Sequence, residues 1–435
     1  MKGAGGDHPE FDLAVIGTGM AGLSAALFAS NRGLSVVLAG RTGGLTYASG
    51  LFDLAEIHPI RDGRSWSDPW DAIDTLRADI RDHPLARVPN RDIRTAIEEI
   101  LSFLKGAGLP YHVEKGKNSE TITPLGTIKR TYAVPLTMTG GVRALVERPS
   151  GLLVDFQGLK EYSAAMVAAG LRSRWPGLRT ASVAFPGMER MSRVYARPMA
   201  QALELEVHLE TLAERLRPIV GDAQVVGLPA VLGLNGRREI TVRLGEMIGA
   251  SVFEVPMLSV SVPGMRLKET FERELAARGV THFFQKKVLA VHGGSGGPFT
   301  LSIGDEEKSQ TVHAKGVILA TGRFFGKGLA ADRKRIRETV FDLPVIQPRD
   351  RTRWHREDLM DPKGHPVSLA GLQTDDAFRP LDRSGRPAFR TLFAAGSILA
   401  HQDWIRTKCG TGLAAATAYA AVEAFQGETG REEGP

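Results

Sequence analysis

The residues best suited to chemistry form a glycine-rich loop near the start of the chain. The loop reads Gly17-Thr18-Gly19-Met20-Ala21-Gly22. In a loop of this spacing, the first glycine permits a tight turn, the second lets a pyrophosphate approach the backbone, and the third lets the next helix pack closely. The exposed N–H groups and the positive end of the helix dipole then hold phosphate. The predicted phosphate contacts are Gly17, Gly19, Met20, Ala21 and Gly22.

One partner of such a loop is missing. The second strand of this unit normally ends in Asp or Glu, which binds an adenosine ribose about 20 residues after the glycines. Here residues 36–39 run into Gly40 and Arg41, and neither is a carboxylate. Either the adenosine half of the cofactor binds loosely, or the cofactor is a mononucleotide. Arg41 could contact a cofactor phosphate, or it could be an ordinary solvated surface arginine. We therefore expect FMN rather than FAD, and expect Gly40→Glu to raise the affinity for FAD.

Two later apolar runs end in small-residue turns that resemble the nucleotide-side motifs of flavoproteins. The first ends in Thr321-Gly322 and the second in Gly396-Ser397. The second motif usually ends in an aspartate that binds the ribityl chain, whereas Ser397 can only offer a hydroxyl. Because all three motifs occur in the expected order, we predict a bound flavin.

A last glycine-rich segment, Gly410-Thr411-Gly412, opens an alanine-rich helix predicted over residues 411–425. The N-terminus of this helix is expected to point at the flavin pyrimidine ring. The helix dipole would there stabilise the negative charge that the ring gains on reduction.

The elements that position these motifs alternate between strands and helices. Buried or alternating patterns predict strands at 11–16, 35–39, 152–156, 182–185, 223–229, 317–322 and 391–395. Apolar residues at helical spacing predict helices at 20–32, over most of 67–109, and at 159–171, 265–277 and 411–425. Glycines 140–141 and the Pro-Ser-Gly at 149–151 predict a linker over 141–150.

These elements predict an α/β protein. Its core is a Rossmann-like flavin-binding domain of the two-dinucleotide-binding type, with an inserted α/β second domain. The flavin domain is expected to be discontinuous, formed by residues 1–66, 245–330 and 366–430. A helical segment, 67–140, and the inserted domain, 151–244, complete the predicted organisation.

Composition narrows the class of protein. The 435 residues carry a net charge of +6 from 55 basic and 49 acidic side chains, an excess that fits an anionic substrate or an acidic partner better than nucleic acid. The single cysteine, Cys409, allows no internal disulfide or cysteine-ligated iron–sulfur cluster, so we expect a packed thiol and no metal. Because no run of about 20 apolar residues occurs, we expect no membrane span and a cytoplasmic location.

Between the motifs, the chain resembles the B subunits of anaerobic glycerol-3-phosphate dehydrogenases along nearly its whole length. The blocks that carry the resemblance are residues 48–54, 123–127, 151–157, 229–234, 322–329, 396–397 and 409–412. The family's arginine after the second strand matches Arg41, and the first block adds Ser49 and Gly50 as expected cofactor contacts. Two segments depart from the family, namely the residues after Ser397, which contain less glycine, and the turn carrying Arg323 and Lys327.

The resemblance implies a function. The family's flavin is described as FMN, with FAD as the alternative. In the family complex, the B subunit joins the A subunit and the iron–sulfur C subunit. The complex oxidises glycerol 3-phosphate to dihydroxyacetone phosphate and delivers electrons to quinone. Attachment to the inner membrane through these partner subunits would follow.

Oxidation of a secondary alcohol also needs a base for the hydroxyl proton. His401 and Asp403 are the candidates, because they lie between the flavin motif and the last helix. Candidates for the substrate phosphate are Arg130, Arg323 and Lys327. Each of these residues has an ordinary structural alternative, as a packed or solvated side chain. The chain is therefore either the catalytic flavoenzyme or an electron-transfer and assembly subunit. A flavin reductase of other specificity is the outside alternative, and no second nucleotide loop supports it.

Overall fold

The computed structural model describes all residues except 1–8, 42, 236–237, 295–297, 306 and 431–435. By internal contacts the chain divides into two compact units. Unit 1 comprises Met1–Gly44, Leu54–Ile100 and Phe271–Pro435, and unit 2 comprises Leu45–Asp53 and Leu101–Thr270. Helices α3 (Asn90–Gly106) and α9 (Val262–Ala277) continue across the division. Unit 2 is thus longer at both ends than the inserted domain predicted over 151–244, because residues 101–150 and 245–270 also belong to it.

Unit 1 contains the nucleotide loop. Its described strands are β1 (Glu10–Ile16), β2 (Val36–Gly40), β11 (Thr281–Phe284), β12 (Lys287–Gly293), β13 (Phe299–Gly304), β14 (Ser309–Leu319), β15 (Leu329–Ala331), β16 (Ile336–Glu338), β17 (Val345–Ile346), β18 (Gly371–Leu372) and β19 (Leu392–Ala394). Its helices are α1 (Met20–Asn31), α2 (Pro69–Asp79), α10 (Trp404–Thr407) and α11 (Gly410–Thr429), with single 3-10 turns at Ile60–Asp62, Pro84–Arg87, Arg351–Arg353, Pro366–Leu369 and Gly396–Ile398.

A seven-stranded sheet forms the centre of the described part of unit 1. Its order is β11-β2-β1-β14-β13-β12. The seventh strand, β19, pairs with residues 317–319 of β14, whereas β13 pairs with residues 309–314 of the same strand. In the parallel pairs, Ile16 of β1 lies opposite Ala39 of β2 and Leu319 of β14, and Leu319 lies opposite Ala394 of β19. This register brings the carboxyl ends of β1, β2, β14 and β19 to one edge of the sheet. A predicted motif follows β1, β14 and β19 there, and β2 ends at Gly40.

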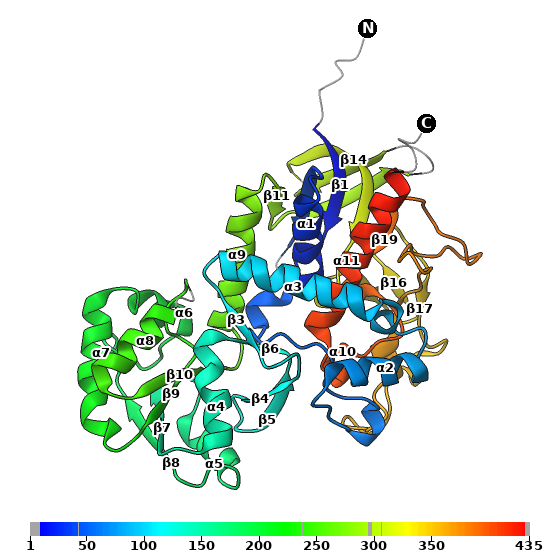
Figure 1. Cartoon of the computed structure of the whole chain (residues 1–435). Helices are drawn as coiled ribbons and strands as arrows, with labels where there is room; N and C mark the ends of the chain where they lie inside the picture. The colour runs from blue at the N-terminus through cyan, green and yellow to red at the C-terminus, as the bar shows by residue number, and fades with distance from the viewer. Residues whose placement is uncertain (1–8, 42, 236–237, 295–297, 306, 431–435) are drawn as a thin grey trace. The chain divides into compact units, whose positions relative to one another are not determined.

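Helices α1 and α11 pack side by side against this sheet (Figure 1). Both are rich in alanine, so their backbones can approach closely, and Phe28 and Tyr419 meet edge to face with ring centroids 5.4 Å apart. The strands and helices expected at 11–16, 20–32, 35–39, 391–395 and 411–425 are therefore confirmed within a few residues at their ends. The strand expected at 317–322 is also present, but β14 begins eight residues earlier and ends at Leu319.

Unit 2 contains a second, smaller sheet. Its described strands are β3 (Tyr111–Val113), β4 (Ser119–Ile122), β5 (Ile128–Thr131), β6 (Ala133–Pro135), β7 (Gly151–Phe156), β8 (Leu178–Val183), β9 (Val225–Pro229) and β10 (Ser251–Val255). Its helices are α4 (Thr139–Glu147), α5 (Ala164–Leu171), α6 (Ala196–Ala202), α7 (Glu206–Val220) and α8 (Arg238–Ile248). Strands β7 to β10 run parallel in the order β10-β9-β7-β8 and share one hydrophobic core with the helices. Residues 111–135, which the predicted helical segment includes, form the four short strands β3 to β6.

The linker predicted over 141–150 is wrong, because most of it belongs to α4. Gly140 and Gly141 lie at the start of this helix, where a Cβ on either would come within 2.9 Å of the Phe253 side chain. These glycines therefore allow a helix to pack closely on a ring, whereas the sequence pattern resembles a flexible joint.

Candidate flavin site

The glycines of the predicted phosphate loop have different neighbours. Gly17 has φ +126°, and a Cβ on it would lie 2.1 Å from the carbonyl oxygen of Ala320. A Cβ on Gly22 would lie 1.8 Å from the carbonyl oxygen of Gly17. At Gly19, no atom of the described residues comes within 4 Å of the corresponding position. The loop thus closes against the sheet at Gly17 and Gly22 and leaves open space at Gly19, where phosphate is predicted to approach.

The two later turns lie against this loop and helix, although the sequence separates them widely. A Cβ on Gly396 would lie 2.6 Å from the Cβ of Ala21, and one on Gly322 would lie 3.4 Å from the Oγ of Ser397. Gly322 and Gly396 have φ +67° and +76°, in the left-handed region that favours glycine. The three motifs that the sequence singles out therefore meet at the carboxyl ends of β1, β14 and β19.

Helices α1 and α11 both begin without a side-chain cap. Among the described residues, none caps α1 at its N-cap Gly19 or α11 at its N-cap Cys409 through a side-chain hydrogen bond. The first N–H groups of a helix have no partner within the helix, so such ends are suited to anionic groups. Gly410 and Gly412 leave room for the Trp404 ring and for Leu54, and Cys409 is a buried thiol.

Two buried polar side chains that the sequence analysis missed hold the second turn. The hydroxyl of Thr417, on α11, accepts a hydrogen bond from the backbone N–H of Gly396 at 2.8 Å. The amide of Gln402 donates to the carbonyls of Ser397 and Leu399 at 3.1 and 3.0 Å. Both side chains are fully buried. The sequence feature that could have pointed to Thr417 is its position as a hydroxyl-bearing residue within an alanine-rich helix.

The end of β2 differs from the expectation for Gly40. A Cβ on Gly40 would lie 2.9 Å from the backbone nitrogen of Thr18. A side chain here would therefore displace the phosphate loop, and this geometry argues against the expectation that Gly40→Glu raises FAD affinity. An exposed carboxylate, Asp305, lies between β13 and β14, where it forms an ion pair with Lys286. The pKa of Asp305 is lowered, first by a hydrogen bond from Lys286 and then by the charges of Lys286 and Arg41.

Ser49 and Gly50 belong to unit 2. Gly50 has φ +84°, and a Cβ on it would lie 2.5 Å from the Cβ of Pro263. The Tyr111 hydroxyl donates to the Gly50 carbonyl at 2.7 Å, and burial raises the pKa of Tyr111. The Oγ of Ser49 accepts the N–H of Leu51 at 3.4 Å. The segment is therefore held in a defined conformation, and its contact with a cofactor stays a prediction.

The two candidate bases, His401 and Asp403, differ in their hydrogen bonds. His401 has φ +63°, and its Nε2 is hydrogen-bonded to the side-chain oxygen of Gln373. Because an amide oxygen can only accept, Nε2 carries the proton and Nδ1 is left as the basic nitrogen. Asp403 is buried and caps α10, where its carboxylate accepts the N–H of Arg406 at 3.3 Å. Of the two, His401 thus keeps an atom that could take a proton.

Two of the three candidates for binding the substrate phosphate, Arg323 and Arg130, are bonded to other groups of the protein. Arg323 donates to the carbonyl of Ser368, and burial lowers its pKa. Lys327, with φ +61°, is exposed on the turn that follows. Arg130, in unit 2, is paired with Glu120 at 3.1 Å. Their roles toward a substrate stay predictions.

Next to Arg130, strand β5 presents a polar cluster that the sequence analysis missed. Lys129 Nζ lies 2.5 Å from Asp53 Oδ2, and the Thr131 hydroxyl donates to Asp53 Oδ1 at 2.9 Å. Alternate residues of a strand share a face, so Lys129 and Thr131 point away from Arg130. Asp53 belongs to the family-like block 48–54, which was the available signal.

A buried histidine lies on the turn after α2. His83 is 1% exposed, and its Nδ1 accepts the N–H of Leu85 at 3.2 Å, while Nε2 has no partner among the described residues. Burial, followed by the charges of His58 and His401, lowers the pKa of His83 to about 3. His83 is therefore neutral at physiological pH, with its proton on Nε2.

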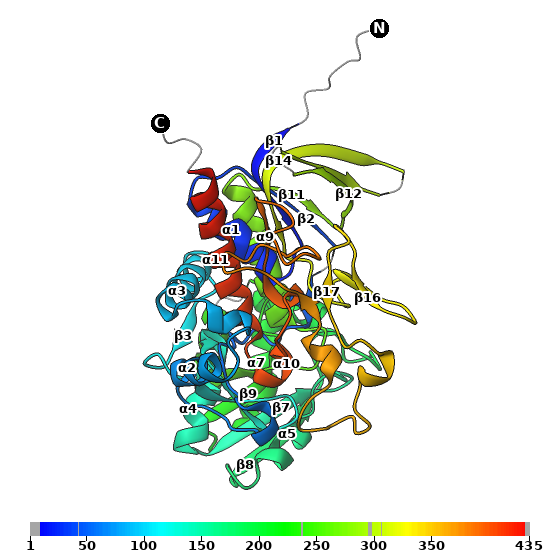
Figure 2. The ribbon, with the colours of Figure 1, turned by 90° about the vertical axis from the view of Figure 1, so that its right-hand side faces the viewer.

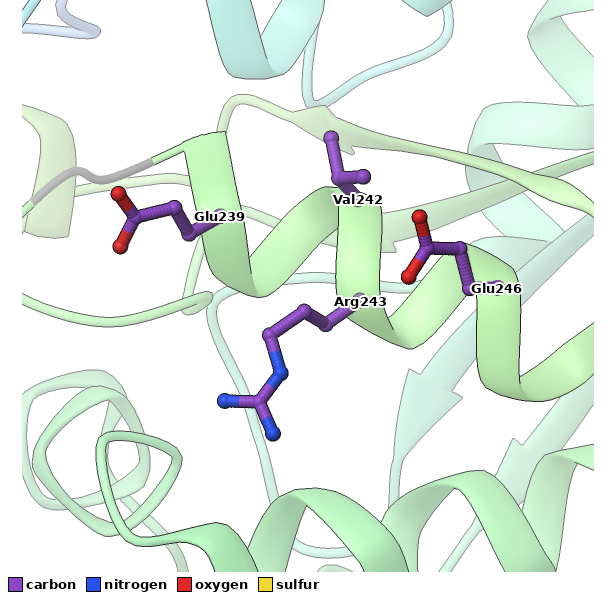
Figure 3. Close-up of a pocket in the computed structure, with 4 residues that line it drawn as sticks. All are labelled: Glu239, Val242, Arg243 and Glu246. Carbon is purple, nitrogen blue, oxygen red and sulfur yellow. The ribbon is translucent and has the colours of Figure 1, made fainter.

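Unit 2 also carries a shallow hollow on helix α8. Figure 3 shows a hollow in unit 2 lined by Glu239, Val242, Arg243 and Glu246, which all project from α8, with the Arg243 side chain pointing away from both glutamates. Across the part of the chain that the structure describes, no group of three or more His, Cys, Asp or Glu side chains could hold a metal ion. In the same residues, no helix is long and apolar enough to cross a bilayer.

Comparison with known proteins gives these features a context. The family model described as "FAD binding domain" matches residues 12–413. The B subunit of the anaerobic glycerol-3-phosphate dehydrogenase of Vibrio cholerae O395 is 30% identical over 95% of this chain and 96% of its own length. The probable B subunit of the same enzyme in Halobacterium salinarum R1 is 32% identical over 95% of this chain and 97% of its own.

Among solved structures, 3-ketosteroid delta1-dehydrogenase from Sterolibacterium denitrificans aligns with a TM-score of 0.42 at 13% identity, over 96% of this chain and 99% of that one. The family match includes each of the converging turns, and both relatives align with 95% of the chain. The chain therefore belongs to the family of FAD-binding oxidoreductases and, within it, to that of the anaerobic glycerol-3-phosphate dehydrogenase B subunits.

Proposed function

We propose that this chain is the flavoprotein subunit of a complex that oxidises glycerol 3-phosphate to dihydroxyacetone phosphate and passes the electrons to quinone. The observation that carries the proposal is the convergence of the three glycine turns, in a chain whose relatives at 30–32% identity bear that name. The proposal includes a flavin domain of the two-dinucleotide-binding type. Its partners are the A subunit and an iron–sulfur C subunit, and its location is cytoplasmic, with attachment to the inner membrane through them.

The residues present fit a flavin. Space at Gly19 and the uncapped N-terminus of α1 suit a phosphate, with Gly17, Met20, Ala21 and Gly22 forming the rest of the cradle. The turns Thr321-Gly322 and Gly396-Ser397 would flank the ribityl chain, and Gly410-Thr411-Gly412 would face the ring. A bound flavin supplies the electron acceptor that alcohol oxidation requires.

The preference for FMN over FAD that we drew from the sequence is not supported by the family match, which is to an FAD-binding domain. We propose FAD instead. The argument for FMN was that β2 ends without a carboxylate, yet Asp305 lies close enough to Arg41 for their charges to interact. A ribose at the end of β2 could therefore find its acceptor on the turn between β13 and β14.

Cofactor identity can be tested on the purified protein. Flavin released by denaturation should have the mass of FAD. In apoprotein reconstituted with added cofactor, Asp305→Asn should weaken FAD binding about 10- to 100-fold, the value of one charge-assisted hydrogen bond, and leave FMN binding unchanged. Asp332→Asn, on another exposed turn, is the control. Stoichiometric FMN in the released fraction, or equal loss of both affinities, would contradict the assignment.

Whether this chain oxidises the substrate itself or relays electrons is a second question. The side chains that could act on glycerol 3-phosphate are mostly engaged elsewhere. Asp403 caps a helix, Arg130 is paired with Glu120, and Arg323 is bonded to a backbone carbonyl. His401 keeps one basic nitrogen, which alone does not recognise a phosphate. These engagements favour the electron-transfer and assembly alternative for this chain within the same complex.

Anaerobic titration separates the two alternatives. With glycerol 3-phosphate added and oxygen removed, the flavin absorbance of the isolated chain should stay unchanged, and it should bleach within one turnover when the A subunit is present. His401→Gln should leave that bleaching intact. Bleaching of the isolated chain, lost in His401→Gln, would show that this chain oxidises the substrate. No bleaching in the assembled complex would sink the proposed function itself.

A further inference from the structure

Between β14 and β19, unit 1 carries a long irregular excursion that the flavin site does not use. Its strands β16 and β17 lie together at the side of the unit (Figure 2). It begins directly after the turn at Gly322, and Phe324 and Phe325, two and three residues later, are 41% and 65% exposed. A protein that bound here would lie next to a segment continuous with the flavin-binding turn.

The hairpin β15–β16 gives the excursion a positive face. Residues 332–353 contain seven basic and four acidic side chains. The exposed basic residues are Arg333, Lys334, Arg335, Arg337, Arg349, Arg351 and Arg353. Three of the four acidic side chains accept hydrogen bonds from backbone N–H groups. Asp332 and Asp350 accept N–H groups of their own turns at 2.7–2.9 Å, and Glu338 is buried, accepts three N–H groups, and has its pKa raised by burial.

A second turn, residues 356–365, presents two apolar side chains. Leu359 and Met360 are 77% and 76% exposed. His365 fixes the turn, because its Nδ1 accepts the N–H of Arg356 at 3.1 Å and its Nε2 is bonded to the carbonyl of Leu359 at 3.0 Å. Arg356 Nε also donates to the Gly364 carbonyl at 2.8 Å. The apolar pair therefore stands on a hydrogen-bonded turn, which lowers the entropy lost when a partner covers it.

Arg351 links the hairpin to the segment that leads into the second turn. Its guanidinium donates to the Asp332 carbonyl at 2.8 Å and lies 5.3 Å from the centre of the buried Trp354 ring, two residues before that turn. The hairpin is thus tied to the base of the segment that carries the apolar pair. Arginine beside exposed aromatic and aliphatic side chains is the composition typical of protein interfaces.

We propose that this excursion surface, formed by Phe325, Arg333, Lys334, Arg335, Arg337, Arg351, Leu359 and Met360, docks the partner subunit that takes electrons from the flavin. The partner's face is acidic, with an apolar recess for Leu359 and Met360. A lipid surface fits less well, because Glu357, Asp358 and Asp361 flank the apolar tip and would be pressed against anionic headgroups. The inference rests on the proposed function, since it requires a complex.

The test uses full-length tagged chain co-expressed with the A and C subunits. Leu359→Ser with Met360→Ser should lower capture of the partners at least 10-fold, and Arg333→Glu with Arg335→Glu should do so most strongly at low salt. Flavin content and thermal unfolding should match wild type. The matched controls are Val146→Ser, 75% exposed in unit 2, and Arg91→Glu, whose side chain is 88% exposed.

Each outcome is decisive. Undiminished capture by both double variants, with wild type capturing normally, overturns the docking surface and leaves the proposed function standing. Failure of wild type to capture either partner overturns the proposed function and this inference with it. Binding of wild type alone to phosphatidylglycerol vesicles, lost in Leu359→Ser with Met360→Ser, would assign the surface to lipid instead.

Discussion

Gly19→Val should purify as a folded protein without its yellow colour. No described atom lies within 4 Å of a Cβ at this position, and φ is −82°, so a valine fits the free protein. Replacing glycine at an N-cap costs about 1 kcal/mol or less. The side chain would instead fill the space through which phosphate reaches the loop. Loss of two charge-assisted hydrogen bonds weakens flavin binding on the order of 100-fold or more.

The neighbouring glycine supplies the contrast. A Cβ on Gly22 would overlap the Gly17 carbonyl at 1.8 Å, so Gly22→Ala should lower the yield of folded protein as well as its flavin content. Gly177→Val, at an open position in unit 2, is the control for adding a side chain alone. The measurements are flavin absorbance per protein, reconstitution affinity and the melting temperature. A fully yellow Gly19→Val protein would place the phosphate elsewhere.

Glu254→Gln should destabilise unit 2 by about 3–5 kcal/mol, as expected when one partner of a buried ion pair is lost. Glu254 and Arg266 have side chains that are 0% and 2% exposed and are joined by two bonds of 2.6 and 2.8 Å. Glu254 also accepts the N–H of Leu232, and Arg266 donates to the carbonyl of Gly233, both at 2.8 Å. The variant leaves a guanidinium charge buried with a neutral partner and loosens the loop after β9.

Chemical denaturation measures this effect as a shift in the unfolding midpoint. Glu206→Gln is the matched control, because the Glu206–Arg243 pair is about half exposed and should contribute no more than about 1 kcal/mol. Replacing both buried partners, as Glu254→Leu with Arg266→Met, should recover most of the loss, since no unpaired charge remains. If the single and double variants were equally unstable, packing and not charge would explain the loss.

Helices and strands that depend on residues close together in the chain could be predicted from the sequence alone. The strand–loop–helix at residues 11–31 and the helix at the C-terminal end depend on buried periodicity and on glycines a few residues apart, so they could be predicted and are present. The family could be recognised as well, because its motifs are short and their order along the chain is enough.

What these residues touch became clear only in the folded chain. Gly19 and Gly22 look equivalent in sequence, yet one is open and the other is packed on Gly17. Gly40 looked like a missing acid, and a close approach to Thr18 explains it. Such contacts join segments far apart in the chain, so no local pattern reports them.

The same reason explains the candidates for chemistry. Residue type suggested Arg130 as a phosphate ligand and Asp403 as a base. In the structure, Arg130 forms an ion pair with Glu120, and the Asp403 carboxylate caps the N-terminus of α10. The hydroxyl of Thr417, which holds the turn at Gly396, was passed over within an alanine-rich helix. A side chain's role depends on the partner that folding brings to it, and that partner is set by the packing of whole elements.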